Sequence, residues 1–256
     1  MSGGVSIGVA GALGPDAVAR IAADVEARGF TALWVNDTPD GDALAALAAA
    51  AAATSTLELA TGVVPVDRRP AADIVRAARA LPAERVVIGI GSGQARHGAL
   101  ALVSDAVGEL RAAGIGRVVV GALGPRMRRL GAESADGVLL NWVPAADVAA
   151  QRRQLREVRA GTRVAVYVRT ALDPAAHASL AAEAARYASF PNYAANFARL
   201  GVGAMDTVFD GAEALAHGIG AYRDAADEVV LRAIVPTHTP DAYAAFIARA
   251  AEEAGL

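Results

Sequence analysis

The chain of 256 residues contains no cysteine. This absence excludes disulfide bonds, thiolate metal sites and a cysteine nucleophile, and it is compatible with a reducing cytosol. Aromatic residues make up only 5% and charged residues 20%, whereas hydrophobic residues reach 54%. This composition predicts a globular protein with a core of small aliphatic side chains, which is typical of helices packed on a parallel sheet.

The sequence also lacks a charge excess of one sign and a long hydrophobic run. Its formal net charge of −3 gives no concentrated basic face for nucleic acid. The longest apolar run, Ala43 to Ala53, is mostly alanine and too short to cross a bilayer, so we expect a helix there. The N-terminus shows no basic segment followed by a hydrophobic core, as a secretion signal would. We therefore expect a cytoplasmic protein without a nucleic-acid or membrane partner.

Strand-like and helix-like segments alternate along the whole chain, and the strands are short and apolar. Eight units of about 32 residues match a (β/α)₈ TIM barrel, an α/β fold of roughly 250 residues. A doubly wound sheet is the alternative. The predicted strands cover residues 5–10, 31–36, 57–64, 85–90, 117–120, 137–141, 162–169 and 229–235.

One stretch, 188–226, is too long for a plain connection before the last strand. Proline and glycine residues divide it into short pieces, which favours a lid or an insertion: Pro191, Gly201, Gly203, Gly211, Gly218 and Gly220. No low-complexity linker is present, so we predict one domain over 1–256.

The segment 117–142 carries the clearest functional signal. Its turn, Gly121 to Pro125, joins a strand to a helix, and arginines 126, 128 and 129 follow. Free backbone N–H groups at a helix start attract an anion, most simply the phosphate of a cofactor. The alternative is an ordinary strand-to-helix turn.

The ends of the predicted strands hold many glycines, few acids or bases and no lysine. The active site of a barrel lies at the C-terminal ends of its strands, and a hydrolase there needs a base or a metal. Because the usual carboxylate and histidine clusters are missing, we predict no metal site and expect a bound cofactor to supply the chemistry.

The run 121–142 resembles the phosphate-loop segment of the luciferase-like monooxygenase superfamily, and it is most similar to the branch that uses the deazaflavin coenzyme F-420. Other segments agree with this family in the same order: 29–37, 60–63 with Arg69-Pro70, 85–93, and Pro191-Asn-Tyr193 followed by Phe197 and Gly201. The resemblance implies a shortened luciferase-like barrel that holds F-420, the preferred cofactor, or FMN at its strand ends.

The resemblance also implies cofactor-binding positions. Gly121, Leu123 and Gly124 would form the phosphate loop, with N–H groups of the last two on the phosphate. Thr61, Gly62 and Val63 would form a bulge behind the ring, where family members often carry a non-proline cis peptide. Gly91 and Ser92 would pass beside the ring or the ribityl chain, and Asn141 would lie near the phosphate or ribityl edge.

The sequence departs from the family at its usual acid–base positions. Thr38 follows Asp37 where many members have a histidine, and Gln94, Arg96 and His97 follow the glycines of the fourth strand where members often have acids. Asp37 and His97 are the remaining catalytic candidates. For Asp37, capping of the next helix is the alternative, and for His97 an exposed loop position.

These observations predict a flavin- or deazaflavin-dependent oxidoreductase or monooxygenase that transfers hydride between its cofactor and a small organic substrate. A cofactor-binding barrel without turnover, or a phosphate-binding aldolase or isomerase, is the alternative. The alanine-rich helices could pack against the barrel or form a homodimer.

Overall fold

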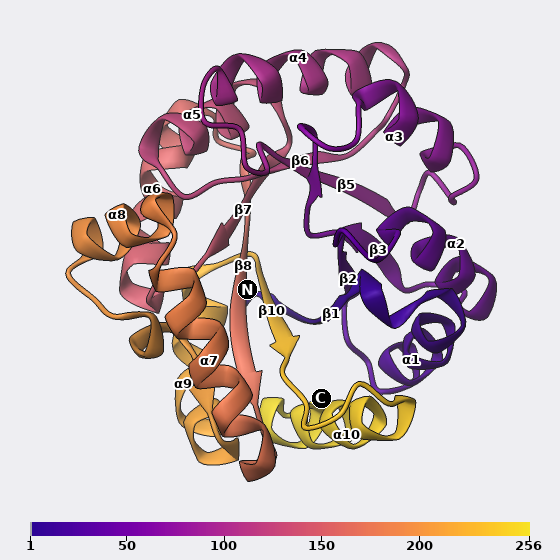
Figure 1. The fold of residues 1–256 in the computed structure, drawn as a ribbon, viewed down its shortest axis with the longest axis vertical. Coiled ribbons are helices and arrows are strands. Elements are labelled where there is room, and N and C mark those ends of the chain that lie inside the picture. Colours follow the sequence, from indigo (N-terminus) through magenta and orange to yellow (C-terminus); the bar gives the residue numbers. More distant parts are fainter. Residues whose placement is uncertain (1) are drawn as a thin grey trace.

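The structure, a computed structural model, describes residues 2–256 and forms a closed barrel of parallel strands surrounded by helices (Figure 1). The eight barrel strands are β1 (Gly4–Ala10), β2 (Ala32–Asn36), β3 (Glu58–Thr61), β5 (Val86–Gly91), β6 (Val118–Gly121), β7 (Gly137–Asn141), β8 (Arg163–Ala171) and β10 (Glu228–Ala233). Two short strands are attached to them: β4 (Val64–Pro65) pairs with β5, and β9 (Phe209–Asp210) pairs with β8.

The helices follow the strands in turn. They are α1 (Pro15–Ala27), α2 (Ala43–Ala53), α3 (Ala71–Ala78), α4 (Ala99–Ala112), α5 (Pro125–Ser134), α6 (Ala145–Val158), α7 (His177–Ala188), α8 (Pro191–Leu200), α9 (Ala212–Ala225) and α10 (Pro240–Ala254). Short 3₁₀ turns span Gly11–Leu13, Pro174–Ala176 and Ala204–Thr207.

Closure of the sheet confirms the predicted barrel. The last strand, β10, pairs in parallel with β1, where Ile7 is opposite Leu231, and also with β8, where Tyr167 is opposite Val230. A doubly wound sheet has two free edges, so this alternative is wrong. The division of the chain into a single domain stays a prediction.

Strand alternation separates an inner from an outer core. The outer residues pack beneath the helices, as Ile7, Leu33 and Ile88 do. The inner residues meet along the barrel axis and form a separate cluster: Ala32, Trp34, Ala60, Val87, Val119, Leu139, Ala165, Tyr167 and Val230. A barrel interior is therefore a packed core, and a ligand must bind at an end of it.

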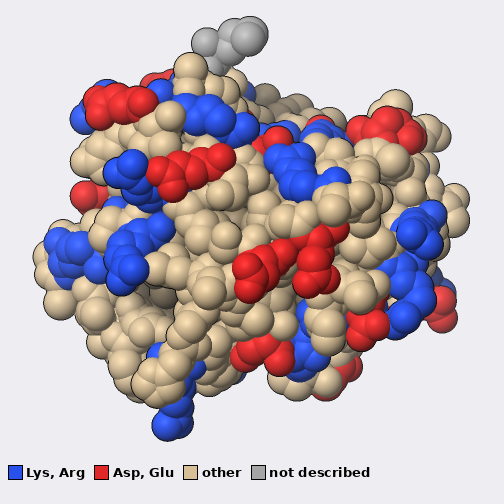
Figure 2. Space-filling model, turned by 90° about the horizontal axis from the view of Figure 1, so that it is seen from above, with Lys and Arg blue, Asp and Glu red and all other residues tan. Residues whose placement is uncertain are grey.

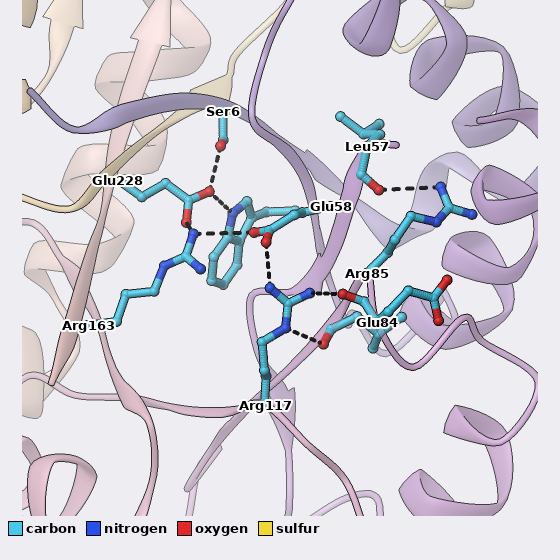
Figure 3. A network of polar contacts seen from close by, with 10 residues as sticks. Ser6, Leu57, Glu58, Glu84, Arg85, Arg117, Arg163 and Glu228 are labelled. Atoms are coloured by element: carbon cyan, nitrogen blue, oxygen red, sulfur yellow. Dashed lines mark hydrogen bonds and ion pairs between the residues drawn. The ribbon is translucent and has the colours of Figure 1, made fainter. Parts of the chain in front are cut away.

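Paired charges close the N-terminal end of the barrel (Figure 3). Glu228 is fully buried and accepts hydrogen bonds from Ser6 and Trp34, while its second oxygen lies 2.7 Å from the Arg163 guanidinium. Arg163 also forms an ion pair with Glu58, and Glu58 forms a second ion pair with Arg117. Burial lowers the pKa of Arg163, but Glu228 and Glu58 more than offset it, so this pKa lies above its ordinary value.

The segment 188–226 differs in part from the expected lid. Its first half forms α8 and the turn at 204–207, but α9 continues without a break through Gly218 and Gly220 and packs against α6 and α10 in the helix ring (Figure 1). The prediction that these two glycines interrupt the segment is wrong. Gly218 allows a close approach instead, because a Cβ atom there would lie 2.5 Å from the Phe209 ring.

Within residues 2–256, no helix is long and apolar enough to cross a membrane, and no group of three or more potential ligand side chains could hold a metal ion. On the face shown in Figure 2, basic and acidic side chains are interspersed, with no broad field of one sign. That face therefore has no basic footprint of the kind that nucleic-acid binding needs.

Candidate functional site

The strand end at 61–65 is interrupted as the resemblance implied. The peptide between Gly62 and Val63 is cis, and it separates β3 from β4. The N–H group of Gly62 donates to the Val35 carbonyl at 2.9 Å, and the Asn36 amide donates to the Gly62 carbonyl. The hydroxyl of Thr61 is occupied by both backbone groups of Gly89 at 2.8 Å, so only the backbone of this residue can face a ligand.

Glycines around this bulge make room for protein side chains. A Cβ atom on Gly91 would lie 2.8 Å from the Val63 side chain, and one on Gly121 would lie 3.1 Å from it. On the other side, a Cβ on Gly62 would lie 2.5 Å from the Tyr167 hydroxyl. Gly91 and Gly121 are thus needed to seat Val63, whatever they contribute to a ligand.

Tyr167 fills the top layer of the barrel beneath the bulge. It packs edge-on against Trp34, with ring centroids 6.2 Å apart, and a Cβ on Gly8 would lie 2.4 Å from its ring. Its hydroxyl is buried and has no hydrogen-bond partner within residues 2–256. Burial raises the pKa of this phenol, against the opposing effect of Arg232 and Arg169, so the group stays protonated near neutral pH.

The predicted phosphate loop lies between β6 and α5. Gly124 is the N-cap of α5 and Pro125 its first residue, as the sequence predicted. The N–H group of Ala122 donates to the Leu139 carbonyl at 3.1 Å. The N–H groups of Leu123 and Gly124 have no acceptor in the described chain, and a Cβ on Gly124 would meet nothing within 4 Å. These two donors are free at a helix N-terminus.

Asn141 belongs to a polar and aromatic cluster at the end of β7. Its side-chain oxygen accepts from Arg169, whose guanidinium also lies 2.9 Å from Glu183 and stacks 4.0 Å above the Trp142 ring. Burial raises the pKa of Tyr193, which hydrogen-bonds Asn141, to about 12. The Asn141 side chain is therefore committed to protein partners.

Trp142 is almost fully buried, in a left-handed backbone conformation with φ of 56°. It packs under α7 and α8 against Tyr187 and Phe197. Its indole N–H is buried without an acceptor among the described residues.

Asp37 is held by arginines. Its carboxylate pairs with Arg68 and lies 3.8 Å from Arg69, and it accepts the N–H of Ala43 at 3.1 Å. The true N-cap of α2 is Asp42, so Asp37 supports the start of that helix from one turn away. No contact joins Asp37 to His97, which is exposed in the loop after β5. The structure does not bring the two catalytic candidates together.

That loop, 92–98, begins with half-buried Ser92 and is attached to the barrel through Asp67. The carboxylate of Asp67 accepts the Gln94 N–H at 2.8 Å and packs against Gly93 so closely that a Cβ there would clash at 1.8 Å.

From the sequence, Tyr167 and Arg169 are expected at the C-terminal end of a strand but without a role, and Arg128 is one of three arginines after the phosphate loop. Alternation along 163–171 places Tyr167 and Arg169 inside the barrel, and this pattern was available in the sequence. Arg128 had no such signal, because three arginines follow the loop and only the packing shows which one is buried.

The C-terminal mouth of the barrel holds several polar groups without partners in the described chain. Besides the free loop N–H groups, four buried polar atoms at the strand ends lack partners within residues 2–256: Asn36 Oδ1, Thr38 Oγ1, Trp142 Nε1 and Tyr167 OH. Buried polar groups in folded proteins are nearly always hydrogen-bonded, so the four atoms at the strand ends favour a ligand there. Three further atoms of this kind belong to the surrounding helices, on Gln151, Arg152 and His177. A cleft of about 580 Å³ lies between α10 and the loops that follow β8 and β10, and none of the four strand-end residues lines it.

Residues 4–99 match the luciferase-like monooxygenase family. The family resemblance is confirmed for this part of the chain, which includes the first strands and the bulge. None of the curated protein sequences compared with the chain matches it.

Solved structures extend the likeness to the whole fold. The coenzyme F-420-dependent tetrahydromethanopterin reductase from Methanopyrus kandleri has a TM-score of 0.74 at 15% identity, covering 99% of this chain and 98% of that protein. An F-420-dependent secondary alcohol dehydrogenase has a TM-score of 0.73 at 15% identity, with 98% and 99% covered.

An FMN-bound protein has the same fold. The oxygenating constituent of 3,6-diketocamphane monooxygenase from Pseudomonas putida has a TM-score of 0.69 at 12% identity, covering 99% of this chain and 98% of that one. Proteins with this fold therefore include both F-420-dependent and FMN-bound enzymes.

Proposed function

We propose that this protein is a flavin- or deazaflavin-dependent oxidoreductase that binds its cofactor at the C-terminal mouth of the barrel. The observation that carries the proposal is the pair of N–H groups on Leu123 and Gly124, which lack acceptors at the start of α5. A helix N-terminus with free donors favours a phosphate group. The similar F-420 and FMN enzymes support this assignment.

The chain would hold the cofactor mainly through its backbone. Leu123 and Gly124 would bind the phosphate, the bulge at 61–63 would support the ring, and the backbone at Gly91 and Ser92 would lie beside it. The cofactor supplies hydride transfer or oxygenation when bound, and the protein binds, orients and shields it. We prefer F-420 because of the Gly-Ala-Leu-Gly-Pro-Arg-Met form of the loop.

A barrel that binds cofactor without turnover is a second candidate. It is favoured by the state of the two predicted catalytic residues, since Asp37 is paired with arginines and His97 is exposed on a loop. A Schiff-base aldolase has no support, because the sequence contains no lysine. A homodimer and a cytoplasmic location stay predictions.

Titration of the purified protein with F-420 and with FMN, followed by absorbance and fluorescence, tests the proposal. We expect one of them to bind with a dissociation constant below roughly 100 µM, about −5.5 kcal/mol. If neither does, the proposal fails. Bound cofactor that no alcohol, aldehyde or nicotinamide reduces would favour the candidate without turnover.

A further inference from the structure

Two arginines share one carbonyl in the phosphate loop. Arg128 of α5 donates to the Leu123 oxygen at 2.7 Å, and Arg199 of α8 donates to the same oxygen at 3.1 Å. A carbonyl oxygen has two lone pairs, so these donors occupy both. Arg199 is fixed in turn by Asn196, whose own amide reaches the Trp142 carbonyl.

This arrangement brings two positive charges together without a counterion. Neither arginine forms an ion pair with any carboxylate in residues 2–256, and Arg128 is only 8% exposed. Burial and the neighbouring Arg199 lower the pKa of Arg128. Burial of Arg128 without a counterion and beside a second positive charge costs free energy, so simple helix packing is a poor explanation for its position.

Peptide geometry gives the pair a role. The Leu123–Gly124 peptide is trans and planar, so its C=O and N–H bonds point in opposite directions. Arginines that hold the carbonyl on one side therefore aim the Gly124 N–H to the other side. That N–H is one of the two free donors at the start of α5.

We propose that Arg128 and Arg199 are positioning residues that orient the Leu123–Gly124 peptide so that the Gly124 N–H faces the phosphate ester of the cofactor. Because Arg199 comes from α8, the inserted helix and the phosphate loop would act together. This inference rests on the proposed function. A peptide free to rotate would instead present its carbonyl oxygen to the phosphate and repel it.

The test compares each phosphorylated cofactor with its phosphate-free counterpart, FMN with riboflavin and F-420 with its bare deazaflavin chromophore. Arg199 is exposed, so Arg199→Met should still fold, with the loss of one hydrogen bond to buried Asn196 that thermal unfolding measures separately. We expect it to weaken binding of the phosphorylated form about tenfold and to leave the phosphate-free form unchanged. Arg199→Lys keeps a donor and should lose less.

A matched variant separates positioning from simple charge. Arg126→Gln removes a positive charge from the first turn of the same helix without touching Leu123. Binding is measured at low salt and in about 1 M salt, where charges are screened beyond about 3 Å. Positioning predicts that the Arg199→Met defect persists in high salt and exceeds that of Arg126→Gln. A defect that disappears in salt, or equals that of Arg126→Gln, overturns the inference.

A double-mutant cycle tests the route through Gly124. Gly124→Pro removes the N–H at a residue whose φ of −86° is near that of proline. In the Gly124→Pro background, Arg199→Met should no longer weaken binding of the phosphorylated cofactor. If it still weakens binding tenfold, Arg199 does not act through the Gly124 N–H. If no cofactor binds the native protein, the proposed function fails as well. If the native protein binds the cofactor and the arginine variants bind it equally well, only this inference is overturned.

Discussion

Buried polar groups have hydrogen-bond partners at one end of the barrel and lack them at the other. At the N-terminal end, Glu228 is fully buried and has a partner for each oxygen, and Arg163 bridges it to Glu58 (Figure 3). At the C-terminal end, buried polar atoms such as the Tyr167 hydroxyl lack partners, and Arg128 has no counterion in the described chain. A complete network closes one end and stabilises the fold. An incomplete one leaves donors for a ligand.

Removal of Glu228 should have the largest effect on this comparison. Glu228→Ala leaves the half-buried Arg163 partly uncompensated and removes the acceptor of Ser6 and Trp34, and we expect a loss of about 3 kcal/mol in the free energy of unfolding. Urea unfolding measures it. The control is Asp73→Ala, which removes one partner of an exposed ion pair and should cost below about 1 kcal/mol. Equal losses in the two variants would mean that the charge network at the N-terminal end of the barrel stabilises the fold no more than an exposed ion pair does.

A methyl group at the mouth should have an intermediate effect. Gly62→Ala places a Cβ atom 2.5 Å from the Tyr167 hydroxyl, and overpacking of this kind costs about 1–3 kcal/mol. We also expect weaker binding of the proposed cofactor, because the bulge at 61–63 must shift. The matched control is Gly116→Ala, whose Cβ also meets nothing within 4 Å and which lies outside the helices and strands. Thermal unfolding should detect a change only in the first variant, and a loss in both would contradict the glycine argument.

The smallest expected effect concerns a carboxylate near the N-terminal end of the barrel. Glu26 accepts N–H groups of Ser55, Thr56 and Leu57, and the hydrogen bond from Thr56 is the main reason that its pKa falls from 4.5 to about 2. Since the folded pKa lies below the unfolded one, the stabilisation is complete above about pH 4.5 and disappears as the pH falls toward 2.

Glu26→Gln should therefore be less stable than the native protein by about 1 kcal/mol at neutral pH, because solvent screens part of the interaction of this carboxylate. The difference should vanish near pH 2. Unfolding free energies measured across this pH range check it, and a difference independent of pH would show that the charge of Glu26 has no part in the contact.

Sequence patterns predicted the barrel strands well because each is a short apolar run between clear stop signals. The bounds of α2 were also correct, at Ala43–Ala53. The prediction failed at Gly218 and Gly220, because a glycine inside a helix looks the same in sequence as a glycine in a turn. Packing of α9 on the ring overrides their weak helix propensity.

For the candidate site, the sequence by itself determined the backbone positions. Strand ends rich in glycine and the turn at 121–125 specify where a cofactor phosphate could bind, since turn chemistry and helix starts are local properties. Only the tertiary structure decided which side chains meet there. The pairing of Asp37 with Arg68, and of Arg128 with Arg199 on one carbonyl, joins residues far apart in the chain. No local pattern encodes such contacts, because they depend on how the helices pack around the closed barrel.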